Sequence, residues 1–309
     1  MTKEIPFVSI ITITRNRAKL IHLCIESIQK QTYTNYEHII VDGNSDDNTR
    51  NIVATYALRD PKIKYVHMNT CGPPQQQQQG FLHSKGEYIT FLDDDDEYLP
   101  NNLKKKLEVF ASLGEEYGFI YGPMDYFDAQ TNKYLYTHIA TLEGGVEILP
   151  KAISRAYVSG TPSIMYRRTA FQDIGGTYIA GIGNEMSDWA LTSRAIARGW
   201  KVKAYNKSLV KIYVNHASER MTDYTSKGKE GAKKLILFHN YFLKEYSSVI
   251  KNNPKSAVIH YLNLLSSYIR LGKYHEAKDI YKKLMATSFS IKYMVLPLYF
   301  IDKTKILRK

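Results

Sequence analysis

The sequence predicts an α/β fold, in which a mostly parallel sheet is flanked by helices and followed by an α-helical C-terminal extension. Short apolar segments alternate with helical segments over the first 115 residues, and this alternation is typical of parallel sheets. The last third of the chain has a helical pattern throughout, with Pro254 and Gly272 at the breaks. We therefore expect a main domain over residues 1–225 and a helical C-terminal region over residues 226–309.

Four apolar segments predict strands in the first part of the sheet. They are expected at residues 7–13, 37–41, 63–67 and 88–92. The first two are separated by a segment with helical periodicity, whose apolar face comprises Leu20, Leu23, Cys24 and Ile28. Further helical segments follow the second strand and precede the fourth. In such sheets, ligands bind beyond the carboxyl ends of the strands.

The pattern changes after residue 115. Residues 119–139 predict a β-hairpin. A helix is expected from Ser187 to Arg198, and Gly199 ends it. The segment at 261–285 has the small-residue and aromatic spacing of one tetratricopeptide-like helical hairpin.

The chain is basic, with 42 Lys and Arg against 30 Asp and Glu and a formal net charge of +12. This excess favours an anionic partner such as nucleic acid, anionic lipid or a phosphorylated small molecule. The sequence has no helix-turn-helix or RNA-binding pattern, so we expect no nucleic acid partner. Cys24 and Cys71 form no spacing motif, and the N-terminus does not resemble a signal peptide. We therefore expect a reducing, cytoplasmic location.

Three polar clusters follow strands of the predicted sheet. They are Thr14-Arg15-Asn16, Asp42 to Asp47, and Asp93 to Asp96. Because the carboxyl ends of parallel strands meet at one edge, we expect these clusters to lie together. The first two also have ordinary structural explanations, since Thr14 and Asn16 can cap a helix and Asp42 can form a turn.

Four adjacent carboxylates after an apolar strand are suited to hold a hard divalent cation. Mg²⁺ and Mn²⁺ prefer oxygen ligands and are often shared with substrate phosphates. An acidic loop leading into a helix near Pro100 would explain one or two of these carboxylates, but not four. An isoprenoid-synthase cluster would require an all-helical protein, which the strand-rich context opposes. Further along, Asp188 can either cap a helix or act as a base for a substrate hydroxyl.

Four motifs, in order, resemble those of the inverting family 2 glycosyltransferases, which have the GT-A nucleotide-diphospho-sugar transferase fold. The motifs are VSIITITRNR, IIVDGNSDDNT, GEYITFLDDDDEYLP and SDWALTSRAIARG. The resemblance implies a nucleotide-sugar-binding half over residues 1–115 and an acceptor-binding half over residues 116–225. It also implies metal-dependent transfer, with Mn²⁺ or Mg²⁺, from a nucleoside-diphosphate sugar to a hydroxyl of a glycan or lipid-linked saccharide.

The resemblance also implies roles for individual residues. Asp188 is the expected catalytic base. Contacts to the nucleotide sugar are expected from Thr14, Arg15, Asn16, Asp42, Gln77, Asp93 and Asp94. The metal is expected at Asp95 and Asp93, and His216 lies where such enzymes place a residue that reaches the diphosphate or the metal. A lone histidine is also often structural. Three positions depart from the family pattern, because Arg15 replaces an aromatic residue, Gln77 an arginine and Ser187 a glutamate.

Two other functions remain open at this point. A sugar-phosphate nucleotidylyltransferase would need a glycine-rich basic loop after the first strand, which TITRNRAKL lacks. A non-catalytic sugar-nucleotide-binding scaffold would not need both Asp95 and Asp188.

The C-terminal tail at 291–309 combines apolar residues with basic ones, namely Lys292, Lys303, Lys305, Arg308 and Lys309. One interpretation is a last packed helix with a solvated basic end. The other is a peripheral contact with the anionic inner face of the cell membrane, which would suit surface polysaccharide synthesis.

Overall fold

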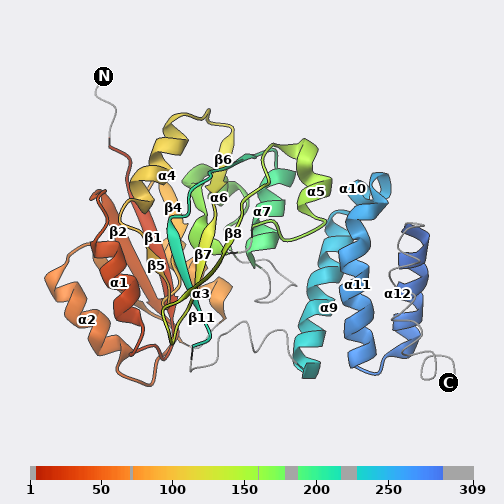
Figure 1. The fold of residues 1–309 in the computed structure, drawn as a ribbon, viewed down its shortest axis with the longest axis horizontal. Helices are drawn as coiled ribbons and strands as arrows, with labels where there is room; N and C mark the ends of the chain where they lie inside the picture. Colours follow the sequence, from red (N-terminus) through yellow and green to blue (C-terminus); the bar gives the residue numbers. More distant parts are fainter. Residues whose placement is uncertain (1–4, 70–71, 159, 178–186, 217–227, 288–309) are drawn as a thin grey trace. The chain divides into compact units, whose positions relative to one another are not determined.

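The computed structural model describes residues 5–69, 72–158, 160–177, 187–216 and 228–287. The chain divides into two compact units. The first comprises residues 1–148, 157–178 and 187–217, and the second comprises residues 149–156, 179–186 and 218–309. The first unit is α/β and the second is helical (Figure 1).

A seven-stranded sheet forms the centre of the α/β unit. Its strand order is β10-β6-β9-β4-β1-β2-β3, and β9 is antiparallel to both of its neighbours. The other pairings in this sheet are parallel, so the predicted mostly parallel sheet is confirmed. The strands are β1 (Val8–Thr14), β2 (Tyr36–Asp42), β3 (Ile63–His67), β4 (Tyr88–Phe91), β6 (Tyr117–Tyr121), β9 (Met165–Arg167) and β10 (Lys201–Ala204).

Helices cover both faces of this sheet, as the alternation of side chains along β1 shows. Thr12 lies 3.4 Å from the Cys24 sulfur of α1, whereas Ile11 meets Gly80 of α3. Successive strand residues point to opposite faces, so α1 and α3 cover opposite faces. The helices of this unit are α1 (Ile21–Gln29), α2 (Thr49–Arg59), α3 (Pro73–Leu82), α4 (Asn102–Ala111), α6 (Arg168–Asp173) and α7 (Ser187–Ala197).

The apolar face of α1 differs from the prediction. Cys24 and Ile28 are buried as expected, but their buried neighbours are Ile21 and Ile25, and Leu20 and Leu23 are only half-buried. The reason is that α1 begins at Ile21, and positions i, i+3, i+4 and i+7 from that residue form the inward stripe. The predicted helix is therefore present, with its apolar face turned by about one residue.

The glutamine tract belongs to α3 and packs closely on the sheet. A Cβ atom at Gly80 would lie 2.4 Å from Ile11 Cγ2, so only glycine allows this approach. Gln76 is buried, and its Nε2 donates to the Thr14 carbonyl at 3.3 Å. The same side chain occupies the space beside Gly43. The tract thereby joins the ends of β1 and β2.

A second, four-stranded sheet has the order β5-β11-β7-β8. It comprises β5 (Glu97–Tyr98), β7 (Met124–Asp128), β8 (Tyr134–His138) and β11 (Val210–Val214). Strands β7 and β8 pair antiparallel, so the predicted hairpin is confirmed. Strand β11 pairs with β5, which directly follows the four aspartates. This pairing joins segments that lie far apart in the sequence.

The core of the α/β unit contains a fully buried lysine. Lys106 of α4 donates to the Pro162 carbonyl at 3.0 Å, and its Nζ lies 4.7 Å from the centre of the Tyr98 ring. Burial lowers the pKa of Lys106 well below its usual value. The next two carbonyls, of Ser163 and Ile164, accept hydrogen bonds from other buried hydroxyls. Hydrogen bonds from buried donors thus fix the successive carbonyls of Pro162, Ser163 and Ile164.

The helical unit comprises α5 (Leu149–Ala152), α9 (Gly228–Glu245), α10 (Ser247–Asn252), α11 (Val258–Arg270) and α12 (Tyr274–Thr287). The predicted hairpin is formed by α11 and α12, and Gly272 between them has a φ of 72°. In the core, His239 and His260 approach each other with Nδ1 atoms 2.9 Å apart, and His260 Nε2 donates to Ile153 O at 2.8 Å. None of the helices described here combines the length and apolar character needed to cross a membrane. The predicted membrane-contacting tail lies outside the described residues.

Candidate active site

The three polar clusters lie at one edge of the large sheet, as predicted. In the parallel register, Thr14 at the end of β1 pairs with Asp42 at the end of β2. On the other side of β1, β4 pairs up to Phe91, directly before Leu92 and the aspartates. The turns after β1, β2 and β4 therefore share the carboxyl edge, where ligands bind in open α/β sheets.

The first two turns are held together by hydrogen bonds. Asn16 has a φ of 55°, and its side-chain oxygen accepts from Asp46 N at 2.8 Å. Its own backbone N–H donates to Ser45 Oγ at 2.9 Å. Thr14 is buried and Arg15 is exposed. Asn16 thus has a local structural role, while nucleotide contacts of these three residues remain a prediction.

Asp42 forms the turn that its sequence context suggested. Its Oδ1 accepts from the backbone N–H and the hydroxyl of Ser45, at 2.9 and 2.7 Å, and its Oδ2 accepts from Tyr65 OH at 2.8 Å. The residue is 1% exposed. These contacts fix the carboxylate at the strand end, and its contact with a nucleotide remains a prediction.

The four aspartates form a tight turn in which successive side chains have different partners. Asp96 N donates to Asp93 O at 3.2 Å, which closes the turn. Asp94 is buried, and its Oδ1 lies 3.5 Å from Arg17 Nε. Burial and the neighbouring Asp95 raise the pKa of Asp94 to about 7. The turn thus concentrates negative charge that a cation would relieve.

Asp95 and His216 lie far apart in the sequence, and the fold brings their side chains together. Asp95 Oδ2 lies 3.5 Å from His216 Nε2, and both side chains are largely buried. His216 lies just beyond β11, and its Nε2 is also 3.0 Å from Tyr213 O. Across the described ranges, no three side chains of His, Cys, Asp or Glu form a ready-made metal site. The chain therefore contributes this carboxylate–imidazole pair at the expected metal position.

Asp188 lies in the first turn of α7, next to residues 178–186, which lie outside the described part of the chain. Its Oδ1 accepts from Trp189 N at 2.8 Å. Burial raises the pKa of Asp188 to about 6. The negative charge of Asp188 also contributes to the raised pKa of the buried Tyr166. A carboxylate with this pKa is ionised at neutral pH and is a stronger base than an exposed aspartate.

Gln77 lies on the buried face of α3 and is 6% exposed. Its Oε1 has no hydrogen-bond partner among the residues described here. A buried amide oxygen without a donor is costly, and a ligand hydroxyl or N–H group would satisfy it.

Two residues at this edge were missed by the sequence analysis. Arg17 is the cation paired with Asp94, and Tyr65 donates to Asp42. Arg17 belongs to the motif TITRNR, so its charge was a usable signal. Tyr65 could not be found in this way, because its contact depends on the pairing of β2 with β3.

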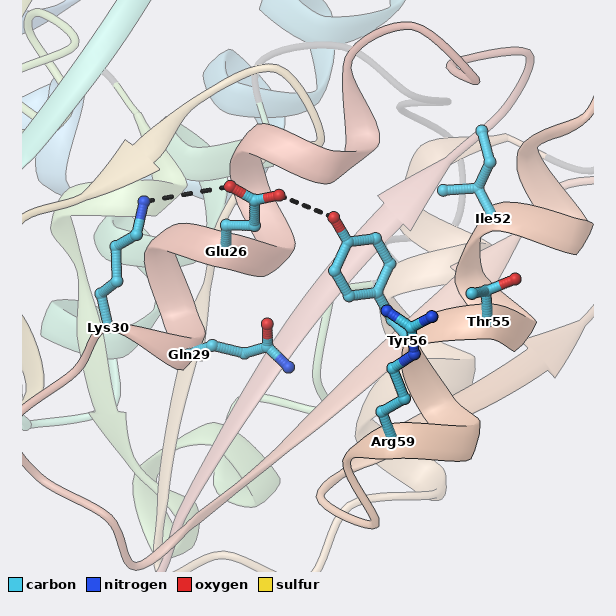
Figure 2. Close-up of a pocket in the computed structure, with 7 residues that line it drawn as sticks. All are labelled: Glu26, Gln29, Lys30, Ile52, Thr55, Tyr56 and Arg59. Atoms are coloured by element: carbon cyan, nitrogen blue, oxygen red, sulfur yellow. Dashed lines mark hydrogen bonds and ion pairs between the residues drawn. The ribbon is translucent and has the colours of Figure 1, made fainter.

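A surface groove between α1 and α2 has a volume of about 580 Å³ and is separate from this site (Figure 2). It is lined by Glu26, Gln29, Lys30, Ile52, Thr55, Tyr56 and Arg59. Glu26 accepts from Tyr56 OH at 2.7 Å and lies 3.9 Å from Lys30 Nζ. All of these residues except Ile52 lie toward the C-terminal ends of the two helices, and helices in β-α-β units run opposite to the strands. The groove is therefore remote from the carboxyl edge.

Solved structures of other proteins have a similar fold. The N-terminal part of Staphylococcus aureus TarS in complex with UDP-GlcNAc aligns with a TM-score of 0.59 at 16% identity, over 93% of this chain and 91% of that one. The mannosyltransferase PcManGT from Pyrobaculum calidifontis, in complex with GDP-Man and Mn²⁺, aligns with a TM-score of 0.56 at 16% identity, over 97% and 81%. The expected GT-A fold is thereby confirmed.

Curated relatives are similar in sequence over parts of their length. WcaA of Escherichia coli K12, a glycosyl transferase named for colanic acid biosynthesis, is 40% identical over 189 residues, which are 61% of this chain and 58% of WcaA. The GalNAc(5)-diNAcBac-PP-undecaprenol beta-1,3-glucosyltransferase of Campylobacter jejuni is 36% identical over 119 residues, 38% of each chain. The chain spans less than half the length of several curated relatives that it matches.

A family model covers the segment that contains the first three motifs. The model described as glycosyl transferase family 2 matches residues 9–175, which is more than half of the chain. The match includes the turns after β1, β2 and β4, and the fold agrees with that of the solved mannosyltransferase. The chain therefore belongs to glycosyl transferase family 2.

Proposed function

We propose that the protein is a metal-dependent, inverting glycosyltransferase that moves a sugar from a nucleoside-diphosphate sugar to a hydroxyl acceptor. The observation that carries this proposal is the Asp95–His216 pair, which lies at the sheet edge that also presents Thr14 and Asp42. The relatives support it, because their names include a glucosyltransferase and a mannosyltransferase. TarS was solved with UDP and with UDP-GlcNAc.

The residues at the site fit a divalent cation. A carboxylate and an imidazole suit Mn²⁺, and the remaining positions would be filled by diphosphate oxygens and water. The buried carboxylates of Asp94 and Asp95 provide the negative charge that a cation offsets. PcManGT, which has a similar fold, was solved with Mn²⁺. A cation bound there would neutralise the charge of the departing nucleoside diphosphate. Asp93 is the further candidate ligand.

The donor is proposed to lie across the turns after β1, β2 and β4. Thr14, Arg15 and Asn16 would contact the nucleotide from the first turn, and Asp42 would do so from the second. Gln77 supplies a buried acceptor oxygen that the described protein leaves free. Asp93 and Asp94 would lie by the ribose and diphosphate, and Asp94 is already partly balanced by Arg17.

Asp188 is proposed as the general base. With a pKa of about 6, its carboxylate is mostly ionised at pH 7 and can take the proton of a hydroxyl held against it. The deprotonated oxygen then attacks the anomeric carbon while the bond to the diphosphate breaks. A single displacement of this kind inverts the anomeric configuration.

The acceptor is proposed to be a glycan or a lipid-linked saccharide in surface polysaccharide synthesis. WcaA is named for colanic acid biosynthesis, and the Campylobacter relative is named for a polyprenyl-linked acceptor. We propose a cytoplasmic location, with peripheral contact between the basic tail and the anionic inner face of the membrane. Salt-sensitive binding to anionic liposomes, lost on truncation after Ser288, would support the contact. Binding unchanged by truncation would contradict it.

Donor hydrolysis in the absence of acceptor tests the proposal. The wild-type protein should slowly hydrolyse at least one nucleotide sugar of a panel with Mn²⁺, and EDTA should abolish this. Asp95→Ala should lose the activity and keep its fold, whereas Asp46→Ala, an exposed carboxylate at the same edge, should keep it. Full activity in EDTA or in the Asp95 variant would contradict the metal role. No hydrolysis of any donor would favour a non-catalytic scaffold.

A further inference from the structure

The position of His216 depends on how the chain is held just after β11. Strand β11 ends at Val214, and Asn215 has a φ of 60°, in the left-handed region that asparagine tolerates better than most residues. His216 is therefore presented by a sharp change of backbone direction. What fixes Asn215 also fixes the imidazole beside Asp95.

Asp128, at the end of β7, makes the direct contact with Asn215. Strands β7 and β11 are parallel, with Asp128 opposite Val214. Asp128 Oδ2 accepts from Asn215 Nδ2 at 2.8 Å. Its Oδ1 accepts from the backbone N–H groups of Gln130 and Thr131, at 3.2 and 2.9 Å, and from Thr131 Oγ1 at 2.8 Å. The hairpin turn therefore orients the carboxylate before it reaches Asn215.

The same turn also binds the backbone of the residues around Asn215. Ala129 N donates to Val214 O at 2.7 Å. Gln130 Nε2 donates to Asn215 O at 3.0 Å. Backbone and side chain of the segment before His216 are thus both held by one turn, which is more than strand pairing alone requires.

We propose that Asp128 and Asn215 are positioning residues that preorganise His216 for a divalent cation shared with Asp95. This inference rests on the proposed metal-dependent function. Neither residue is a proposed ligand, and their effect passes through the backbone to the imidazole. Residues that orient a metal ligand typically affect metal affinity by about 10- to 100-fold when they are changed.

The proposal is tested by changing the hydrogen-bonded side chains of Asp128 and Asn215 and measuring how tightly the protein binds Mn²⁺ alone. Free Mn²⁺ is titrated with protein and measured by electron paramagnetic resonance, and thermal unfolding is recorded in parallel. Asp128→Ala removes the acceptor for Asn215 Nδ2 and should weaken Mn²⁺ binding by about tenfold. Asn215→Asp makes two carboxylates face each other and should weaken it as well, despite the added negative charge.

The double variant Asp128→Asn, Asn215→Asp restores one donor and one acceptor and should recover most of the affinity. Asn215→Gly tolerates the left-handed backbone but lacks the side-chain bond, so it should weaken binding without a large loss of stability. Unchanged Mn²⁺ affinity in the single variants, or no recovery in the double variant, would overturn the positioning role alone. A wild-type protein that binds no Mn²⁺, or a His216→Ala variant with wild-type affinity, would overturn the metal role of His216 and the positioning role with it.

Discussion

Asp96 Oδ1 accepts a 2.8 Å hydrogen bond from the backbone N–H of Tyr213, which joins the turn after β4 to strand β11. Asp96, the last aspartate of the cluster, thus has a different kind of partner from the aspartates before it. Asp94 pairs with Arg17 and Asp95 with His216, whereas Asp96 is 1% exposed and fastens the turn to the second sheet. Adjacent carboxylates of one cluster therefore have different tasks.

Replacing Asp96 should test this structural role. Asp96→Ala leaves the buried Tyr213 N–H without its acceptor and should lower the free energy of unfolding by about 1–3 kcal/mol. Asp96→Asn keeps a side-chain oxygen and should cost less. Urea denaturation measures both, with Asp46→Ala as the exposed control. Equal losses in the alanine and asparagine variants would show that the carboxylate charge matters, and not the hydrogen bond.

The pH dependence of turnover should follow Asp188. If its pKa of about 6 governs the base, kcat/KM rises with pH and reaches a plateau above that value. At pH 5 it should be about a tenth of the plateau. Asp188→Asn should lower turnover by about 10²- to 10⁴-fold and change donor affinity little. Loss of donor binding together with turnover would assign Asp188 to the donor site or to folding.

The same carboxyl should also affect stability. Its pKa is higher in the folded protein than its ordinary value of 3.8, so the folded state binds the proton more tightly. Stability is then lost as pH rises from about 4 to 6. Asp188→Asn should therefore be more thermostable than the wild type at pH 8, by a few degrees, and similar to it at pH 4. A variant less stable than the wild type at pH 8 would contradict this.

The buried Lys106 should make the stability of the protein increase with pH, which is opposite to the effect of Asp188. Burial holds the pKa of Lys106 well below its ordinary value in the folded protein, so stability rises as the pH rises toward the ordinary lysine value. Lys106→Met fills a similar volume without a titrating amine. The stability of the variant relative to the wild type should therefore fall as the pH rises toward 10, with a slope of at most about 1.4 kcal/mol per pH unit. Thermal unfolding at several pH values measures this, and parallel curves would contradict it.

The His239–His260 pair should make the helical unit acid-sensitive. Burial lowers the pKa values of the two imidazoles to about 3 and about 4, below the ordinary value of 6.5. Their contribution to stability is complete above pH 6.5 and is lost as pH falls toward 4. In the variant His239→Leu, His260→Gln, the glutamine amide can still donate toward Ile153 O. This variant should lose stability less steeply on acidification, as measured by circular dichroism. An unchanged slope would exclude the pair as the cause.

Local patterns allowed much of the fold to be predicted. The strand at 63–67 has the predicted bounds, because its apolar and β-branched residues are a local signal. Strand β9 was not predicted, since three residues carry too little pattern and its position depends on pairing with β4 and β6. The face of α1 was misjudged by about one residue, because the helix start determines which stripe turns inward.

The sequence predicted those parts of the site that lie directly after the strands of the large sheet. The turns after β1, β2 and β4 meet because parallel strands end at a common edge. The placement of His216 came from family resemblance, and physical reasoning from the sequence could not have supplied it. It requires β11 to pair with both β5 and β7, and such long-range pairing leaves no local trace.

The packing of α3 also constrains how this chain can change in length. A run of five glutamines suggests that the gain or loss of one glutamine would not disturb the structure. However, an insertion rotates everything after it by about 100° around the helix axis. It would place a glutamine where Gly80 meets Ile11 and turn the buried Phe81 away from its contacts. Length variants of this tract should therefore be lost from natural populations, although substitutions at its half-buried Gln75 and Gln79 should be tolerated more easily.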